Sequence, residues 1–140
     1  MSKVLLDTDI LSEILKGKSA VVTARARTYL AQQASFTTSA VSVAEIVYGL
    51  RRVGREDRLA QFEAALETAE VLPFDDDAAR LAGRINADLE RVGRIIGMPD
   101  VFIAAIALRN GLPIVTGNVA HFEQVRSAGY DLHIDNWRTI

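Results

Sequence analysis

The sequence predicts an α/β fold in which a mostly parallel sheet is covered by helices. Short apolar runs, typical of buried strands, alternate along the chain with longer amphipathic segments typical of helices. Strands that are separated by helices favour a parallel sheet in a layered α/β architecture. A further segment, Val101 to Leu108, is apolar on every face and predicts a helix that is buried all round.

The strand candidates are short, and we expect a sheet of four to five of them. They are Lys3–Leu6, Ser35–Thr38, Glu70–Pro73, Leu112–Thr116 and Leu132–Ile134. Segments with helical periodicity separate the first four of these strands, which favours parallel pairing in one sheet over hairpins.

Helices are expected between the strands, and helix should outweigh strand. The candidates are Ile10–Lys16, Ser19–Gln33, Val41–Val53, Glu56–Thr68, Asp75–Val92 and Pro99–Asn110. Apolar residues at helical spacing define their core faces: Val22, Ala26 and Leu30 in the second, Val43, Ile46, Val47 and Leu50 in the third, and Leu81, Ile85, Leu89 and Val92 in the fifth. Gly111 follows the last helix as expected for a glycine just past a C-terminus.

The composition narrows the class of protein. With 140 residues we expect a single domain spanning residues 1–140, and 49% hydrophobic with 24% charged residues is an ordinary globular balance. The net charge of −2 lacks the strongly basic character of a protein that coats nucleic acid, so contact with RNA or DNA requires a local basic patch or metal ions. The absence of cysteine excludes disulfides and thiolate metal sites, and 2 histidines argue against zinc.

The N-terminal residues and the apolar stretches indicate where in the cell the protein is expected. Met1 to Asp9 reaches two carboxylates after a short apolar run, unlike a signal peptide. The longest apolar stretches are too short to span a bilayer. We therefore expect a cytoplasmic protein with no membrane contact.

Four polar residues, far apart in the sequence, are predicted to meet at one edge of the sheet. Asp7 directly follows the first strand, Glu45 lies near the start of the helix after the second strand, and Asp100 opens the buried helix. Asn118 comes two residues after the strand that ends at Thr116. Ligands of open α/β sheets bind beyond the carboxyl ends of the strands, where these residues fall.

Carboxylates gathered at such an edge predict a metal site of a particular kind. Crowded carboxylates raise one another's pKa unless a cation neutralises them. Magnesium takes oxygen ligands, usually one or two carboxylates with water and phosphate oxygens, and stabilises charge that develops on a phosphodiester. The pattern therefore favours phosphate-ester chemistry over zinc hydrolysis or redox.

Each of these residues also has a structural interpretation when taken alone. Asp7 fits a strand-end residue hydrogen-bonded to nearby backbone N–H groups. Ser42-Val-Ala-Glu45 fits a capping box, and Asp100 fits a charge that interacts favourably with the helix dipole. Asn118 fits a turn residue or an N-cap. Their convergence is what supports the functional interpretation.

Other charged residues carry weaker signals. Asp75-Asp76-Asp77 predicts a helix N-cap. Arg51, Arg55 and Arg58, with Arg52 beside them, are predicted on one helical face, where they either contact RNA backbone or form a solvated face paired with Glu56 and Asp57. His121 is favoured as a surface histidine over a residue that touches substrate.

Four segments and a C-terminal DNW span nearly the whole chain: VLLDTDILSEILKG, SAVSVAEIVYGLRR, IGMPDVFIAAIAL and PIVTGNVAHFEQV. In this order and spacing they resemble the PIN-domain nucleases and, within them, the VapC toxins of toxin–antitoxin pairs. The resemblance implies a PIN-like three-layer fold. It also implies a magnesium-dependent endoribonuclease, with Mn²⁺ as a substitute ion, that cuts structured cellular RNA and arrests growth.

The resemblance also implies roles and partners. Asp7 and Asp100 would be the principal metal ligands, and Glu45 would bind a second metal or orient the attacking water. Asn118 stands where related nucleases sometimes carry an Asp, which favours one well-held magnesium; Thr116 and Asn118 would hydrogen-bond a ligating carboxylate or water. The implied partners are a second copy of the chain and a VapB-like antitoxin that covers the acidic pocket, with DNA contacted only through that complex.

The start DTDIL departs from the DTNIL-like start that is commoner in the family. Asp9 therefore either adds an acid near the site or caps the helix predicted from Ile10, and we favour the cap because Asp accepts backbone N–H bonds as Asn does.

Three other functions remain open from the sequence. Asp7-Thr-Asp9 resembles the start of haloacid-dehalogenase-type phosphatases, which use the first Asp as a nucleophile, but such enzymes need a downstream Lys and here no Lys follows Lys18. A non-catalytic binding module would not require all three acids. A housekeeping PIN nuclease of RNA maturation would share the fold and the site with a toxin.

Overall fold

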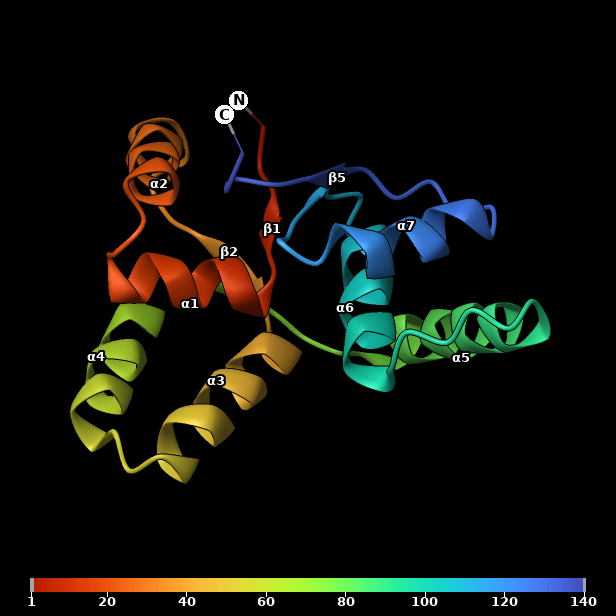
Figure 1. Ribbon diagram of the computed structural model, residues 1–140, viewed down its shortest axis with the longest axis horizontal. Coiled ribbons are helices and arrows are strands. Elements are labelled where there is room, and N and C mark those ends of the chain that lie inside the picture. The colour runs from red at the N-terminus through yellow and green to blue at the C-terminus, as the bar shows by residue number, and fades with distance from the viewer. Residues whose placement is uncertain (1, 140) are drawn as a thin grey trace.

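Five parallel strands form the central sheet of the computed structural model, which describes residues 2–139 (Figure 1). The strands are β1 (Leu5–Leu6), β2 (Thr37–Ser39), β3 (Glu70–Leu72), β4 (Ile114–Val115) and β5 (Ile134–Asp135). Their order across the sheet is β3-β2-β1-β4-β5, and each neighbouring pair is parallel. The predicted α/β class and its parallel sheet are confirmed.

Helices cover both faces of the sheet and complete three layers. They are α1 (Thr8–Lys16), α2 (Ala20–Gln33), α3 (Ala40–Arg52), α4 (Glu56–Leu66), α5 (Asp76–Arg91), α6 (Met98–Arg109) and α7 (Val119–Ser127). Figure 1 shows α1 to α4 on one side of the strands and α5 to α7 on the other. None of the described helices is long and apolar enough to cross a membrane.

The central strand β1 divides the interior into two cores. Successive residues of a strand point to opposite faces, so Leu5 and Leu6 enter different layers. Leu5 packs in a cluster with the buried residues of α5, α6 and α7, whereas Leu6 packs with those of α1 to α4. Both leucines are fully buried, which fixes the register of the strand because a shift by one residue would exchange its two faces.

The predicted all-buried helix is α6. Val101 and the run from Ile103 to Ala107 are buried, as a helix that is apolar on every face requires. The chain enters α6 through Gly97, whose φ of 96° favours glycine, and Pro99 lies in the first turn. Asp75, predicted as an N-cap, does cap α5 by accepting a hydrogen bond from Ala78 N.

Three details of the prediction were wrong. Helix α7 was not predicted; it is nine residues long, and only Phe122 and Val125 on it are buried. In α2 the third buried position is Tyr29, not Leu30, because the tyrosine ring packs against Trp137 in the core. Val92 lies beyond the end of α5 and is exposed rather than part of the core.

Candidate active site

Asp7 is the buried centre of the site. It follows β1 directly, and its backbone N–H donates to Val115 O in the neighbouring strand at 2.9 Å. Its side chain caps α1: Oδ1 accepts from Thr8 N at 2.8 Å, and Oδ2 accepts from Thr116 Oγ1 at 2.8 Å. The residue is only 4% exposed. Asp7 therefore has the backbone hydrogen bond expected of a strand-end residue and also presents a carboxylate at the edge of the sheet.

The environment of Asp7 works against its charged form. Burial raises the pKa of Asp7 from 3.8 to about 7, although the hydrogen bonds from Thr116 and Thr8 act in the opposite direction. The negative charges of Asp9 and Asp100 raise the pKa of Asp7 further. A divalent cation placed here would relieve both effects, since it favours the ionised carboxylate.

Asp100 lies in the first turn of α6, as predicted. Its Oδ2 atom is 2.7 Å from His121 Nδ1 and accepts a hydrogen bond from Asn118 Nδ2 at 3.3 Å. The side chain is 19% exposed, so one part of it reaches solvent while Oδ2 is held by α7. The helix dipole contributes here too, because a carboxylate at a helix N-terminus is stabilised.

Asn118 connects the two aspartates through the loop after β4. Its backbone N–H donates to Thr116 Oγ1 at 2.9 Å, and Thr116 in turn donates to Asp7. Asn118 is the N-cap residue of α7, but its side chain makes no capping hydrogen bond and turns toward Asp100 instead. Hydrogen bonds thus run without a break from Asp7 to Asp100, and the predicted hydrogen bond between Thr116 and a site carboxylate is present.

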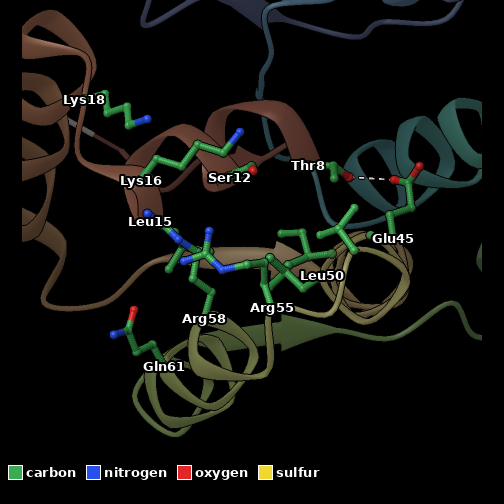
Figure 2. Close-up of a pocket in the computed structure, with 13 residues that line it drawn as sticks. Thr8, Ser12, Leu15, Lys16, Lys18, Glu45, Leu50, Arg55, Arg58 and Gln61 are labelled. Carbon is green, nitrogen blue, oxygen red and sulfur yellow. Dashed lines mark hydrogen bonds between the residues drawn. The ribbon is translucent and has the colours of Figure 1, made fainter.

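Glu45 stands beside this network rather than inside it. Its Oε1 atom accepts from Thr8 Oγ1 at 2.6 Å (Figure 2). The Oγ atoms of Thr8 and Ser42 lie 3.0 Å apart, and because Thr8 has one hydroxyl proton, which it gives to Glu45, it accepts from Ser42. Thr8 therefore links Asp7, which accepts from its backbone, to Glu45, which accepts from its side chain.

The capping box predicted from Ser42 to Glu45 is wrong. Strand β2 runs to Ser39, and α3 begins at Ala40, earlier than the predicted Val41. Ser39 is the N-cap and accepts from Ser42 N at 3.0 Å, which leaves Glu45 in the second turn, out of reach of the capping position. Glu45 is consequently free of the structural role that competed with the functional one.

His121 was favoured as a surface histidine over a residue that touches substrate. Its side chain is 44% exposed, but its Nδ1 atom contacts both Asp100 and Asn118, the latter at 2.8 Å. This contact with Asp100 was not predicted, because helix α7, which turns His121 back toward the start of α6, was itself not predicted. Thr8 was also not predicted as a site residue. Its position between Asp7 and Asp9, directly after a strand, could have indicated such a role.

Asp9 does not cap a helix that starts at Ile10, because α1 begins at Thr8 and its cap is Asp7. Asp9 Oδ1 does accept from Ile10 N at 2.7 Å, but Oδ2 accepts from Gly117 N at 2.9 Å and lies 3.6 Å from Arg138. Burial raises the pKa of Asp9, and the nearby Arg138 lowers it. Asp9 thus anchors the loop that carries Asn118 and adds negative charge near Asp7.

The four arginines do not share one helical face. Helix α3 ends at Arg52, and α4 begins at Glu56, so the chain turns between them. Arg51 pairs with Glu56, and Arg55 pairs with Asp57 through two hydrogen bonds of 2.9 and 3.0 Å, as the alternative of a solvated face predicted.

The donors at this edge are the kind that a hard divalent cation takes. Two carboxylates, Asp7 after β1 and Asp100 in the first turn of α6, are close enough for the charge of Asp100 to raise the pKa of Asp7. Within residues 2–139, no group of three or more acidic or histidine side chains is arranged to hold an ion by itself. The side chains therefore fit a metal held by two carboxylates and completed by water and phosphate oxygens, not a closed protein cage.

A parallel α/β sheet flanked by helices, with Asp7 and Asp100 near one another at its edge, matches the PIN class of nucleases. The PIN-domain family model matches residues 4–127. The chain belongs to the PIN-domain family and, within it, to the VapC group, as its relatives show. PIN domains are a nuclease fold, and PIN-domain nucleases generally depend on divalent metal.

The similar proteins cover nearly the whole chain. It is 37% identical to the tRNA(fMet)-specific endonuclease VapC of Shigella flexneri, over 89% of this chain and 93% of the relative. It is 30% identical to Ribonuclease VapC2 of Haemophilus influenzae, over 98% and 99%. The crystal structure of DNA-bound VapBC from Salmonella typhimurium superposes with a TM-score of 0.83 at 30% identity, covering 98% of this chain and 99% of the solved one.

Proposed function

We propose that this chain is a magnesium-dependent endoribonuclease that acts as the toxin of a toxin–antitoxin pair and cleaves structured cellular RNA. The observation that carries the proposal is the continuous hydrogen-bonded network that joins Asp7 to Asp100 through Thr116 and Asn118. The names of the relatives, an endonuclease specific for a transfer RNA and a ribonuclease, support RNA as the substrate class.

Asp7 and Asp100 would hold the metal, with Mn²⁺ as a substitute for Mg²⁺. When bound, the ion supplies a water of lowered pKa and stabilises the charge that develops on the scissile phosphate. Thr116 and Thr8 orient the Asp7 carboxylate, so its oxygens need no rearrangement when the ion arrives. Asn118 and His121 orient Asp100 in the same way.

Glu45 is placed to act on the attacking water. Thr8 donates to one carboxylate oxygen of Glu45 and leaves the other to accept a proton. Among the described residues, the phosphatase alternative lacks its general acid and its lysine: Asp9 is engaged by Gly117 and Arg138, and no Lys follows Lys18. The geometry therefore favours attack by water over a covalent aspartyl-phosphate.

The proposal includes partners. The structural neighbour from Salmonella is a toxin–antitoxin complex on DNA, and we propose that this chain likewise pairs with a VapB-like antitoxin and meets DNA only in that complex. We also propose that residues 1–140 form a single PIN domain. Two copies of the chain would form a homodimer that works in the cytoplasm. A small antitoxin gene beside its own would distinguish the toxin from a housekeeping PIN nuclease.

The test is cleavage of total RNA by the pure protein with Mg²⁺ or with EDTA, followed by mapping of new 5′ ends. We expect defined cuts with Mg²⁺ and none with EDTA. Asp100→Asn should lower the cleavage rate by on the order of a hundredfold or more, because the loss of a metal ligand removes much of the transition-state stabilisation. Asp131→Asn, which changes an exposed carboxylate away from the site, is the matched control. An Asp100→Asn protein as fast as the parent would exclude the proposed site.

A further inference from the structure

A groove of about 400 Å³ leads away from the site between α1 on one side and α3 and α4 on the other (Figure 2). Thr8 and Glu45, which face the metal-binding edge, are part of its lining. Along α1, Ser12 and Lys16 follow Thr8 at four-residue spacing and therefore share its face. The groove is thus continuous with the candidate active site and extends about 12 Å beyond it, at 1.5 Å per helical residue.

The charge in the groove changes from one end to the other. Figure 2 shows the Thr8–Glu45 hydrogen bond at one end and the cationic groups of Lys16, Lys18 and Arg58 toward the other. Within the described part of the chain these three cations have no carboxylate partner, whereas Arg55 pairs with Asp57. Unpaired cations around a concave surface create a positive potential that attracts anions.

Between the two ends the groove is apolar. Leu15 of α1 and Ile46, Leu50 and Val53 of the opposite wall provide aliphatic surface. Gly49 opens this wall, because a Cβ atom there would meet no other atom within 4 Å. A flat apolar group, followed by an anion, fits this combination of surface and charge.

We propose that this groove holds an unpaired nucleotide of the RNA substrate, next to the phosphodiester that is cut. The base lies on the aliphatic wall beside Gly49 and Leu50, and the following phosphates lie near Lys16 and Arg58. The inference rests on the proposed function and assigns to it a binding subsite. The unpaired cations attract the phosphates of a polyanion, which supports RNA as the occupant.

Gly49 allows a test that adds bulk to the groove without touching the metal ligands. Gly49→Leu fills the open space, and leucine has a higher helix propensity than glycine, so the variant should remain folded. The matched control is Gly83→Leu, at an exposed glycine of α5 that is also free of neighbours within 4 Å. Binding of a labelled single-stranded RNA of mixed sequence is measured by fluorescence anisotropy in EDTA, so that cleavage does not contribute.

We expect Gly49→Leu to weaken RNA binding by about tenfold and Gly83→Leu to leave it unchanged. A second variant, Lys16→Ala, adds no bulk. The logarithm of its RNA-binding constant should fall less steeply with the logarithm of salt concentration, with a slope smaller in magnitude by about 0.7, as expected for the loss of one phosphate contact to a single strand. With Mg²⁺, Gly49→Leu and Lys16→Ala should each raise KM for cleavage more than they lower kcat.

The outcomes separate this inference from the proposed function. If the parent cuts RNA and Gly49→Leu binds RNA as the parent does, the subsite is excluded while the nuclease stands. If Gly49→Leu impairs only binding of a protein partner, the groove belongs to that partner and the subsite is again excluded. If the parent binds RNA through the groove but never cuts it, the proposed function fails and the binding site remains.

Discussion

Thr116 Oγ1 donates a hydrogen bond of 2.8 Å to Asp7 Oδ2, joining two residues 109 positions apart at the ends of adjacent strands. Since the hydroxyl also accepts from Asn118 N, its proton is directed at Asp7. The hydrogen bond stabilises the ionised form of a carboxylate that burial disfavours.

Replacing this hydroxyl should change the pH dependence of cleavage. Thr116→Val keeps the shape of the side chain but removes the hydroxyl donor. Because the hydrogen bond from Thr116 lowers the pKa of Asp7, the loss of this hydrogen bond should raise the pKa of Asp7. The acidic limb of the profile of kcat/KM against pH should move upward by about one pH unit. Thr28→Val, at an exposed threonine of α2, is the control. An unshifted limb would show that Asp7 does not govern the rate.

The buried charge of Asp7 should also appear in stability without metal. Its pKa is 3.8 in the unfolded chain and about 7 in the folded protein, so the folded state binds more protons between these values. The free energy of unfolding in EDTA should therefore fall as pH rises from about 4 to about 7, by roughly 4 kcal/mol in total.

Asp7→Asn removes the group that titrates and should abolish most of that fall. Urea unfolding at several pH values in EDTA measures it, with Asp131→Asn as the control for an exposed carboxylate. Added Mg²⁺ at pH 8 should stabilise the parent and not the Asp7→Asn protein, since only the parent binds the ion well. Equal pH slopes for the parent and Asp7→Asn would contradict the assignment.

His121 should affect cleavage by orienting Asp100 for metal binding. Its Nδ1 atom contacts Asp100 Oδ2, and loss of a group that orients a ligand typically costs ten- to a hundredfold in metal affinity or activity. His121→Ala should raise the Mg²⁺ concentration for half-maximal cleavage by about tenfold, with activity recovered at high Mg²⁺. His133→Ala, whose side chain is 74% exposed, should have no such effect. The prediction fails if the two variants have the same Mg²⁺ requirement.

Gly117 and Arg138 should be energetically coupled. A Cβ atom at Gly117 would overlap with the Arg138 guanidinium, so Gly117→Ala displaces the guanidinium from Asp9 and Glu13. In an Arg138→Ala background the same substitution should cost less, with a coupling of about 1 kcal/mol. Urea unfolding of the two single variants and the double variant measures it, and Gly83→Ala serves as the control. Strict additivity would mean that the guanidinium does not hold the loop.

The sequence predicted the layers and the two aspartates because these depend on local signals. An apolar strand followed by Asp7, and a helix that is apolar all round and opened by Asp100, are each contained in a few neighbouring residues. The position of Asn118 followed from the same logic of strand ends.

Contacts made by helices with weak patterns could not be predicted in the same way. The course of α7 decides where His121 points, and its two buried residues leave too faint a periodicity to detect. The role of Glu45 depended on whether β2 ends at Thr38 or Ser39, and boundaries of elements are poorly defined by composition. The roles of Asp7 and Asp100 as metal ligands stay predictions.

The place of β1 between β2 and β4 has a consequence for how the protein is made. On the ribosome β1 and β2 emerge well before β4, Thr116 and Asn118, so β1 has a bare edge in the interval. Without that edge filled, Asp7 has neither Thr116 nor the Val115 carbonyl to hold it. A nascent chain therefore cannot assemble the proposed site before β4 has emerged, and the order of translation itself delays activity until then.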